Sequence, residues 1–194
     1  DETSRGLGDV YKRQVRLRLR SELSEVLEAC NASGVIVTHD PDEALAICDR
    51  VAVMRDGVLH QCASPQDIVR TPATPFVGSF VLQRNVIPAQ SIQPDQWSCP
   101  LGDLSDQDIR MGATTASENN CCVLVESKDI EIVADDGGHA SIVGREFLGD
   151  LWEYRVRMGE LIVRATCPVE RDYPPHMPCN LKVKSGAAID LMAS

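Results

Sequence analysis

The pattern of apolar and polar residues changes near the middle of the chain. Over residues 15–82, helical spacing alternates with short β-branched runs, which is typical of an α/β fold. Over residues 85–194, short apolar runs are separated by Gly, Pro, Asn and Asp, which favours a small β-barrel or sandwich. We therefore expect two regions of different fold class.

The first region combines helices with one strand that has a buried pattern. Six apolar residues recur at the spacing of one helix face: Val15, Leu19, Leu23, Val26, Leu27 and Cys30. Four β-branched residues, 35–38, then predict a central strand of a parallel sheet. The other elements that we expect are helices over residues 41–48, 64–70 and 76–80, and hairpin strands over 50–55 and 58–62.

His39 is the candidate functional residue of this region. It directly follows the predicted strand, and ligands of open α/β sheets bind beyond the carboxyl ends of such strands. Asp40 is a good N-cap and Pro41 suits the first helical position, so a short turn would hold the imidazole where it can face a phosphate. From spacing alone, a structural histidine without a ligand is the alternative interpretation.

The second region contains short runs with strand character. The expected strands cover residues 85–92, 122–127, 130–133, 140–148, 151–157, 161–166 and 180–184. Residues 94–120 are polar and rich in Asp and Ser, so we expect a long irregular loop there. Trp152 and Tyr154 alternate on one strand and share a face, where core or inter-subunit packing is favoured over stacking of a ligand.

Composition narrows the function classes. The net charge of the 194 residues is −10, which argues against nucleic-acid binding because phosphate neutralisation needs clustered Lys and Arg. The chain is 43% apolar and 25% charged, as in an ordinary soluble globular protein. No stretch approaches the roughly 20 apolar residues of a transmembrane helix, so we expect contact with a membrane only through partners.

The eight cysteines predict no metal site. They contain no C-x-x-C pair and have no histidine at ligand spacing: Cys30, Cys48, Cys62, Cys99, Cys121, Cys122, Cys167 and Cys179. Small buried thiols in a reducing cytoplasm are the expected state. The adjacent Cys121 and Cys122 should point to opposite faces of a strand. His139 and His176 lie near turns and belong to no constellation.

The residues around His39 also resemble a known family. Three stretches, residues 37–45 (VTHDPDEAL), 48–57 (CDRVAVMRDG) and 61–65 (QCASP), resemble the last part of an ABC-transporter nucleotide-binding domain. The importer subunits for ferric iron, polyamines, sulfate and related solutes are the most similar branch. This resemblance covers about residues 15–82. It implies that His39 is the switch histidine that contacts the γ-phosphate of ATP, with ATP and Mg as cofactors.

Other motifs of that family are absent from this sequence. It contains no G-x-x-x-x-G-K-[ST] phosphate loop, no Leu-Ser-Gly-Gly-Gln signature and no apolar strand that ends in Asp-Glu. We therefore expect the chain alone to be inactive as an ATPase, because nothing in it cradles the phosphates or holds magnesium. Residues 1–14 fit neither the family nor an amphipathic pattern, so we expect a foreign or disordered end.

A second resemblance covers part of the β-rich region. Residues 144–156 (GREFLGDLWEYRV) resemble the oligonucleotide-binding-like domain that follows the nucleotide-binding domain in these importer ATPases. The fold class implied is α/β, the C-terminal part of a P-loop domain, followed by an all-β barrel over residues 85–194. Many relatives have Arg-Pro-Glu where this chain has Glu126, Ser127 and Lys128, which changes any contact that the arginine would make.

Together these resemblances imply a fragment of an importer ATPase that couples ATP binding and hydrolysis to solute uptake. Ferric iron is the first expected solute, and polyamine, thiamine or sulfate stay open. The implied partners are a second copy of the subunit, membrane-spanning permease subunits and, indirectly, an extracytoplasmic solute-binding protein, at the cytoplasmic face of the inner membrane. The alternatives are a β-barrel module that binds a small anion, and a non-catalytic interaction protein.

Overall fold

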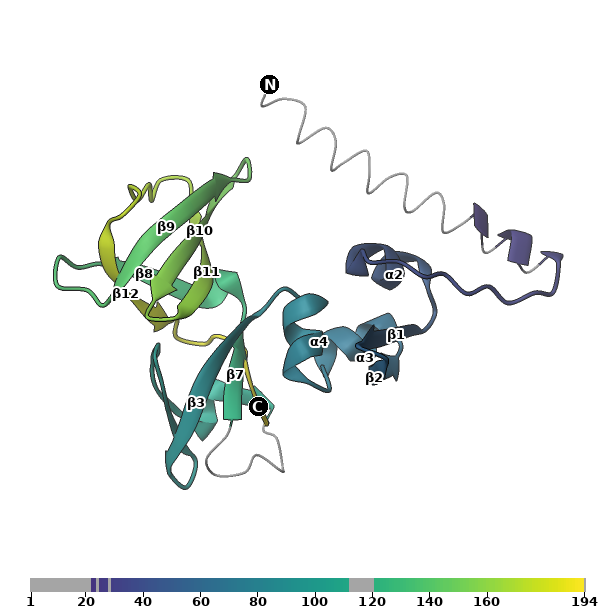
Figure 1. The fold of residues 1–194 in the computed structure, drawn as a ribbon, viewed down its shortest axis with the longest axis horizontal. Helices are drawn as coiled ribbons and strands as arrows, with labels where there is room; N and C mark the ends of the chain where they lie inside the picture. Colours follow the sequence, from purple (N-terminus) through teal and green to yellow (C-terminus); the bar gives the residue numbers. More distant parts are fainter. Residues whose placement is uncertain (1–21, 24, 28, 112–120, 194) are drawn as a thin grey trace. The chain divides into compact units, whose positions relative to one another are not determined.

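The computed structural model describes residues 22–23, 25–27, 29–111 and 121–193. Most of the described chain is β-sheet, with few helices. The chain divides into two compact units, Asp1–Ala73 and Thr74–Ser194 (Figure 1). The expected foreign or disordered end, residues 1–14, lies outside the described residues.

The first unit contains short elements that the sequence largely predicts. Its described helices and strands are α2 (Pro41–Ile47), β1 (Val51–Arg55), β2 (Val58–Ala63) and α3 (Pro65–Arg70). The antiparallel β1–β2 hairpin turns at Asp56 and Gly57, whose φ values of 51° and 78° match a turn with two left-handed residues. The described residues of the predicted first helix, 22–29, are helical, whereas residues 15–21 lie outside the described part.

Side-chain caps explain why the short helices begin where they do. The Asp40 carboxylate accepts a hydrogen bond from the backbone N–H of Asp42, and Pro41 is the first residue of α2. Ser64 accepts from the backbone N–H of Asp67 in the same way at α3. Both caps satisfy N–H groups that have no partner inside the helix, and the cap at Asp40 confirms the sequence prediction.

The predicted central strand over residues 35–38 is wrong for this structure. The segment forms no strand among the described residues. Val35 and Val37 are 93% and 94% exposed, and Ile36 is also exposed. A strand exists only where a neighbouring backbone completes its hydrogen bonds, and no described segment does so here.

The second unit consists of helix α4 (Pro75–Phe80) and two sheets. The strands of the first sheet are, in spatial order, β11 (Leu161–Pro168), β10 (Leu151–Met158), β9 (Ala140–Phe147), β12 (Pro178–Val183) and β8 (Ile130–Ala134). The strands of the second are, in spatial order, β5 (Gly102–Ser105), β4 (Gln96–Cys99), β3 (Asn85–Gln93), β7 (Cys121–Val125), β13 (Ile189–Ala193) and β6 (Ile109–Met111). All seven strands expected from the sequence are present within a few residues.

The predicted irregular loop over residues 94–120 is wrong in its first part. Strands β4, β5 and β6 lie there, together with the short 3-10 helix η1 (Asp106–Asp108), and residues 112–120 lie outside the described part. These strands are only three or four residues long, and their polar sequence hides the period of two. The C-terminal strand β13 was also missed.

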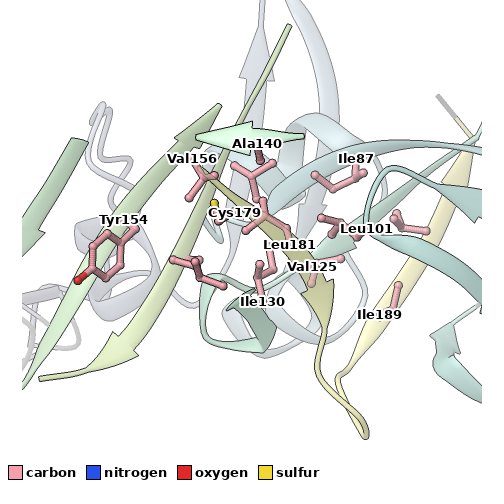
Figure 2. Close-up of a cluster of buried hydrophobic side chains, with 14 of the residues drawn as sticks. Ile87, Leu101, Val125, Ile130, Ala140, Tyr154, Val156, Cys179, Leu181 and Ile189 are labelled. Atoms are coloured by element: carbon pink, nitrogen blue, oxygen red, sulfur yellow. The ribbon is translucent and has the colours of Figure 1, made fainter. Parts of the chain in front are cut away.

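The two sheets of the second unit share one hydrophobic core. Figure 2 shows Tyr154 at one end of the cluster of buried side chains and Leu101 and Ile189 at the other. Asn85 links the sheets, because its Nδ2 donates to the carbonyl oxygens of Val125 and Arg164 at 3.2 and 2.9 Å. Its Oδ1 accepts from the backbone N–H of Arg164 at 2.8 Å. The prediction that Trp152 and Tyr154 pack in the core is confirmed, with Tyr154 fully buried and Trp152 against the core.

Helix α4 packs on the second sheet. It contacts β3 and β7, and a side chain at Gly78 would collide with that of Leu124. The helix falls within the region 15–82 expected to be α/β, and it belongs to the same compact unit as the two sheets. The aromatic pair of this helix, Phe76 and Phe80, lies only partly in the core. Phe80 is exposed, and its ring stacks on that of Phe76 with 5.3 Å between the ring centroids.

The segment after α4 is held by a buried ion pair. Arg84 Nη1 lies 2.5 Å from the carboxylate of Asp190 on β13, and its Nη2 lies 3.3 Å from Glu126. Glu126 also pairs with Lys128, from the short 3-10 helix η2 (Ser127–Asp129). The turn after β7 therefore supplies an acceptor for Arg84.

The cysteines are not all buried as expected. Cys121, Cys122, Cys167 and Cys179 are buried, but Cys30 and Cys62 are exposed. Cys121 belongs to the main core and Cys122 to a separate cluster with Leu124 and Met192, which confirms that the pair faces opposite sides of β7. Burial raises the pKa of the Cys122 thiol to about 11.

Candidate functional site

His39 lies in a bend between the unpaired segment 35–38 and helix α2, and its side chain is exposed. An exposed imidazole on a short turn can offer a hydrogen-bond donor or acceptor to a ligand that approaches from outside. The position of His39 just before a capped helix agrees with the sequence expectation. The strand that should precede it is missing from the described structure.

Thr38 fixes the turn that carries His39. Its Oγ1 donates to the carboxylate of Glu43 at 2.8 Å and accepts from the backbone N–H of Asp40 at 3.0 Å. Residues on both sides of His39 are therefore anchored to the first turns of α2. Sequence reasoning missed this role of Thr38, although a threonine two residues before an N-cap is a recognisable signal for such a turn.

His39 does not assemble a catalytic group with other residues of this structure. Among the residues that the structure describes, no group of three or more His, Cys, Asp or Glu side chains could hold a metal ion. The other two histidines named in the sequence analysis, His139 and His176, lie in the second unit, near the turn before β9 and before β12. The described residues thus place His39 on an exposed turn and provide no cradle for a polyphosphate.

Comparisons with known proteins extend this description. The Fe(3+) ions import ATP-binding protein FbpC of Rhizobium etli is 33% identical over 168 residues, which are 84% of this chain and 46% of that protein. The protein of the same name from Brucella abortus is 28% identical and covers 91% of this chain and 51% of its own length. The sulfate/thiosulfate import ATP-binding protein CysA of Brucella melitensis is 32% identical over 64% of this chain and 33% of its own length.

Two further comparisons do not support a family assignment. No protein-family model matches the sequence. A molybdate-bound crystal structure of the cytoplasmic molybdate-binding protein ModG aligns with 57% of this chain and 96% of its own chain, at 8% identity and a TM-score of 0.40, which is too low to support an assignment. Within the described residues, no helix is long and apolar enough to cross a membrane.

The import ATP-binding relatives cover most of this chain, but the chain spans only about half the length of the first of them. The candidate histidine, its capped helix and the hairpin occur in the order that the sequence resemblance requires. The chain is homologous to the ATP-binding subunits of ABC importers and is consistent with a C-terminal part of such a subunit.

Proposed function

We propose that this chain is part of the ATP-hydrolysing subunit of an ABC importer and that His39 contacts the γ-phosphate of ATP in the complete subunit. The observation that carries the proposal is the 33% identity to an iron-import ATP-binding protein over 84% of the chain. The complete subunit couples ATP binding and hydrolysis to solute uptake. The chain alone is inactive, because its sequence contains no phosphate loop, signature or acidic strand end.

The exposed segment before His39 supports this proposal. The side chains of Val35 and Val37 are almost fully exposed to solvent, although β-branched runs of this kind usually form central strands. We infer that neighbouring strands of the nucleotide-binding domain, from the part of the subunit outside this chain, cover the two valines. The completed sheet would place His39 at the carboxyl end of one of its strands, where nucleotides bind in such folds.

The role of His39 follows from the chemistry of the imidazole. A neutral imidazole has one N–H donor and a protonated one has two, so either form can donate a hydrogen bond to an oxygen of the terminal phosphate. The Thr38 contacts to Asp40 and Glu43 would keep the ring in place, so that little reorganisation is needed when the nucleotide arrives. ATP and Mg would supply the reacting phosphate and its charge neutralisation, held mainly by residues outside this chain.

We propose the partners and the solute from what the names of the relatives say. Two copies of the subunit would enclose ATP and drive permease subunits at the cytoplasmic face of the inner membrane, with an extracytoplasmic protein delivering the solute. We propose ferric iron as the first solute, because two of the relatives named here are iron-import proteins that match most of the chain, and sulfate as the second. The β-rich domain, residues 85–194, would serve dimerisation or regulation.

The proposal is tested in the complete subunit that contains this sequence. The variant His39→Ala should lower ATP turnover by about 100-fold or more, because it removes a hydrogen-bonding group at the reacting phosphate. Circular dichroism and the unfolding midpoint should stay unchanged, since His39 is exposed. A phosphate-release assay measures the turnover.

The matched control is His139→Ala, which removes an exposed histidine from the second unit. That variant should keep the turnover of the unmodified subunit. If His39→Ala also keeps it, the assignment of His39 is wrong. Transport assays with radioactive ferric iron and sulfate in cells that contain the intact operon then decide between the two solutes.

A further inference from the structure

A pocket in the second unit has no part in the proposed ATPase role. Its volume is about 410 Å³, within the usual range of small-molecule sites. Strand β5, helix η1 and the residue before β5 form one wall. The end of β12 and the turn into β13 form the other. Two segments about 80 residues apart in sequence therefore face each other across this space.

The floor of the pocket is apolar. Leu101, Leu104 and Ile189 line it and are buried members of the main core. Figure 2 shows Leu101 and Ile189 at the same end of that core. Val183 and Ala187 also line the pocket and are partly buried against the same cluster. A ligand with an apolar body would release ordered water from this floor when it binds.

Two of the charged groups in the pocket wall already have structural partners. The Asp108 carboxylate accepts hydrogen bonds from the backbone N–H and the hydroxyl of Ser105, both at 2.8 Å. These bonds hold the pKa of Asp108 below its ordinary value. The ammonium group of Lys184 donates to the backbone carbonyl of Lys128. Asp108 and Lys184 therefore act mainly to fix the two walls.

The turn that forms one wall is also held by its backbone. The N–H of Lys184 donates to the carbonyl of Asp129 at 2.8 Å, and the N–H of Ala187 donates to the carbonyl of Lys184 at 3.2 Å. Gly186 takes a φ of 79°, which suits a residue without a side chain. A wall fixed in this way does not need to be ordered by the ligand, so less binding energy is lost.

Two more charged groups lie in the pocket wall. Asp103 and Lys182 have exposed side chains, one of each sign, on opposite walls. With the other described residues, neither side chain forms a hydrogen bond or an ion pair. A ligand with only one charge would satisfy one of the two groups and bring apolar surface against the other.

We propose that this pocket binds a small organic zwitterion. Its ammonium group would pair with Asp103, its carboxylate would pair with Lys182, and its apolar chain would cover Leu101, Leu104 and Ile189. A zwitterion also avoids the repulsion that a simple anion meets from a chain with a net charge of −10. The site is independent of ATP and of His39, so the proposal stands or falls separately from the ATPase assignment.

Isothermal titration of the full chain with three compounds of one carbon skeleton tests the proposal. ε-Aminocaproate carries both charges, caproate carries only the negative charge and hexylamine carries only the positive charge. We expect ε-aminocaproate to bind about tenfold more tightly than either of the others, because it alone makes both charge-assisted hydrogen bonds. Equal affinity of caproate and ε-aminocaproate, or no binding of ε-aminocaproate at millimolar concentration, would overturn the proposal.

Variants assign the two ends of the ligand. Lys182→Gln should weaken ε-aminocaproate and caproate by a similar factor and leave hexylamine unchanged, whereas Asp103→Asn should weaken ε-aminocaproate and hexylamine and leave caproate unchanged. Both side chains are exposed, so both variants should fold. The matched control is Arg157→Gln, an exposed charge on β10 that does not line the pocket. A loss of affinity in the control equal to that in Lys182→Gln would show a general charge effect and refute the site.

Discussion

Two apolar runs of similar pattern have opposite environments in the two units. The side chains of Val35, Ile36 and Val37 are exposed, with an exposed fraction of 94% for Val37, whereas Cys121–Val125 form strand β7 and are buried along their whole length. Strand β7 lies between β3 and β13, and its two faces meet separate apolar clusters. An apolar run therefore becomes a buried strand only where two backbone neighbours and two covering layers are present.

The largest expected effect concerns the residues that hold β13 beside β7. Asp190→Asn should lower the free energy of unfolding of the second unit by about 3–5 kcal/mol, because it leaves the buried guanidinium of Arg84 without its closest counter-charge. Urea unfolding followed by tryptophan fluorescence measures this loss, since both tryptophans lie in this unit. A loss below about 1 kcal/mol would mean that Glu126 alone can satisfy Arg84.

A matched pair of truncations compares the two runs directly. Val123→Ala should cost about 2–3 kcal/mol, because Val123 is fully buried in β7 and its truncation leaves a cavity. Val37→Ala should change the free energy of unfolding of this chain by less than about 0.5 kcal/mol, since its side chain is exposed. In the complete importer subunit, we expect Val37→Ala to cost as much as Val123→Ala. If Val37→Ala costs less than about 0.5 kcal/mol in the complete subunit as well as in this chain, the proposal that other strands cover residues 35–38 is wrong.

A smaller effect is expected where α4 meets β7. Gly78→Ala places a methyl group inside the contact distance of Leu124, which is fully buried and has little room to move. Overpacking costs about 1–3 kcal/mol and the gain in helix propensity returns about 1 kcal/mol, so the net loss should be about 1 kcal/mol. Thermal unfolding of the variant measures it. A stabilised variant would show that the contact between α4 and β7 is loose.

A further effect is a dependence on alkaline pH. Burial raises the pKa of Cys122 from the ordinary 9.0 to about 11, so the folded state keeps a thiol where the unfolded state forms a thiolate. This contribution is fully present below about pH 9 and is lost as the pH rises through about 11. The urea midpoint should fall over that range, and should fall less in Cys122→Val. An identical fall in both proteins would assign it to other groups.

The second unit could be predicted further from sequence than the first. Its longer strands alternate buried and partly buried residues clearly, as in β8 and β11, and turn residues separate them. The strands β4 to β6 and β13 could not be predicted, because three to five residues carry too few periods to reveal a face. At the candidate site, the position of His39 and the cap at Asp40 were predictable, whereas the contacts of Thr38 with Glu43 required the structure.

The sequence by itself determined the local features of this protein: the caps at Asp40 and Ser64, the hairpin turn at Asp56 and Gly57, and the family resemblance around His39. These depend on backbone preferences and hydrogen bonds within a few residues. Tertiary structure alone decided that one apolar run is buried and the other exposed, and that Arg84 finds Asp190. Such outcomes depend on segments that are distant in sequence, whose meeting no local pattern specifies.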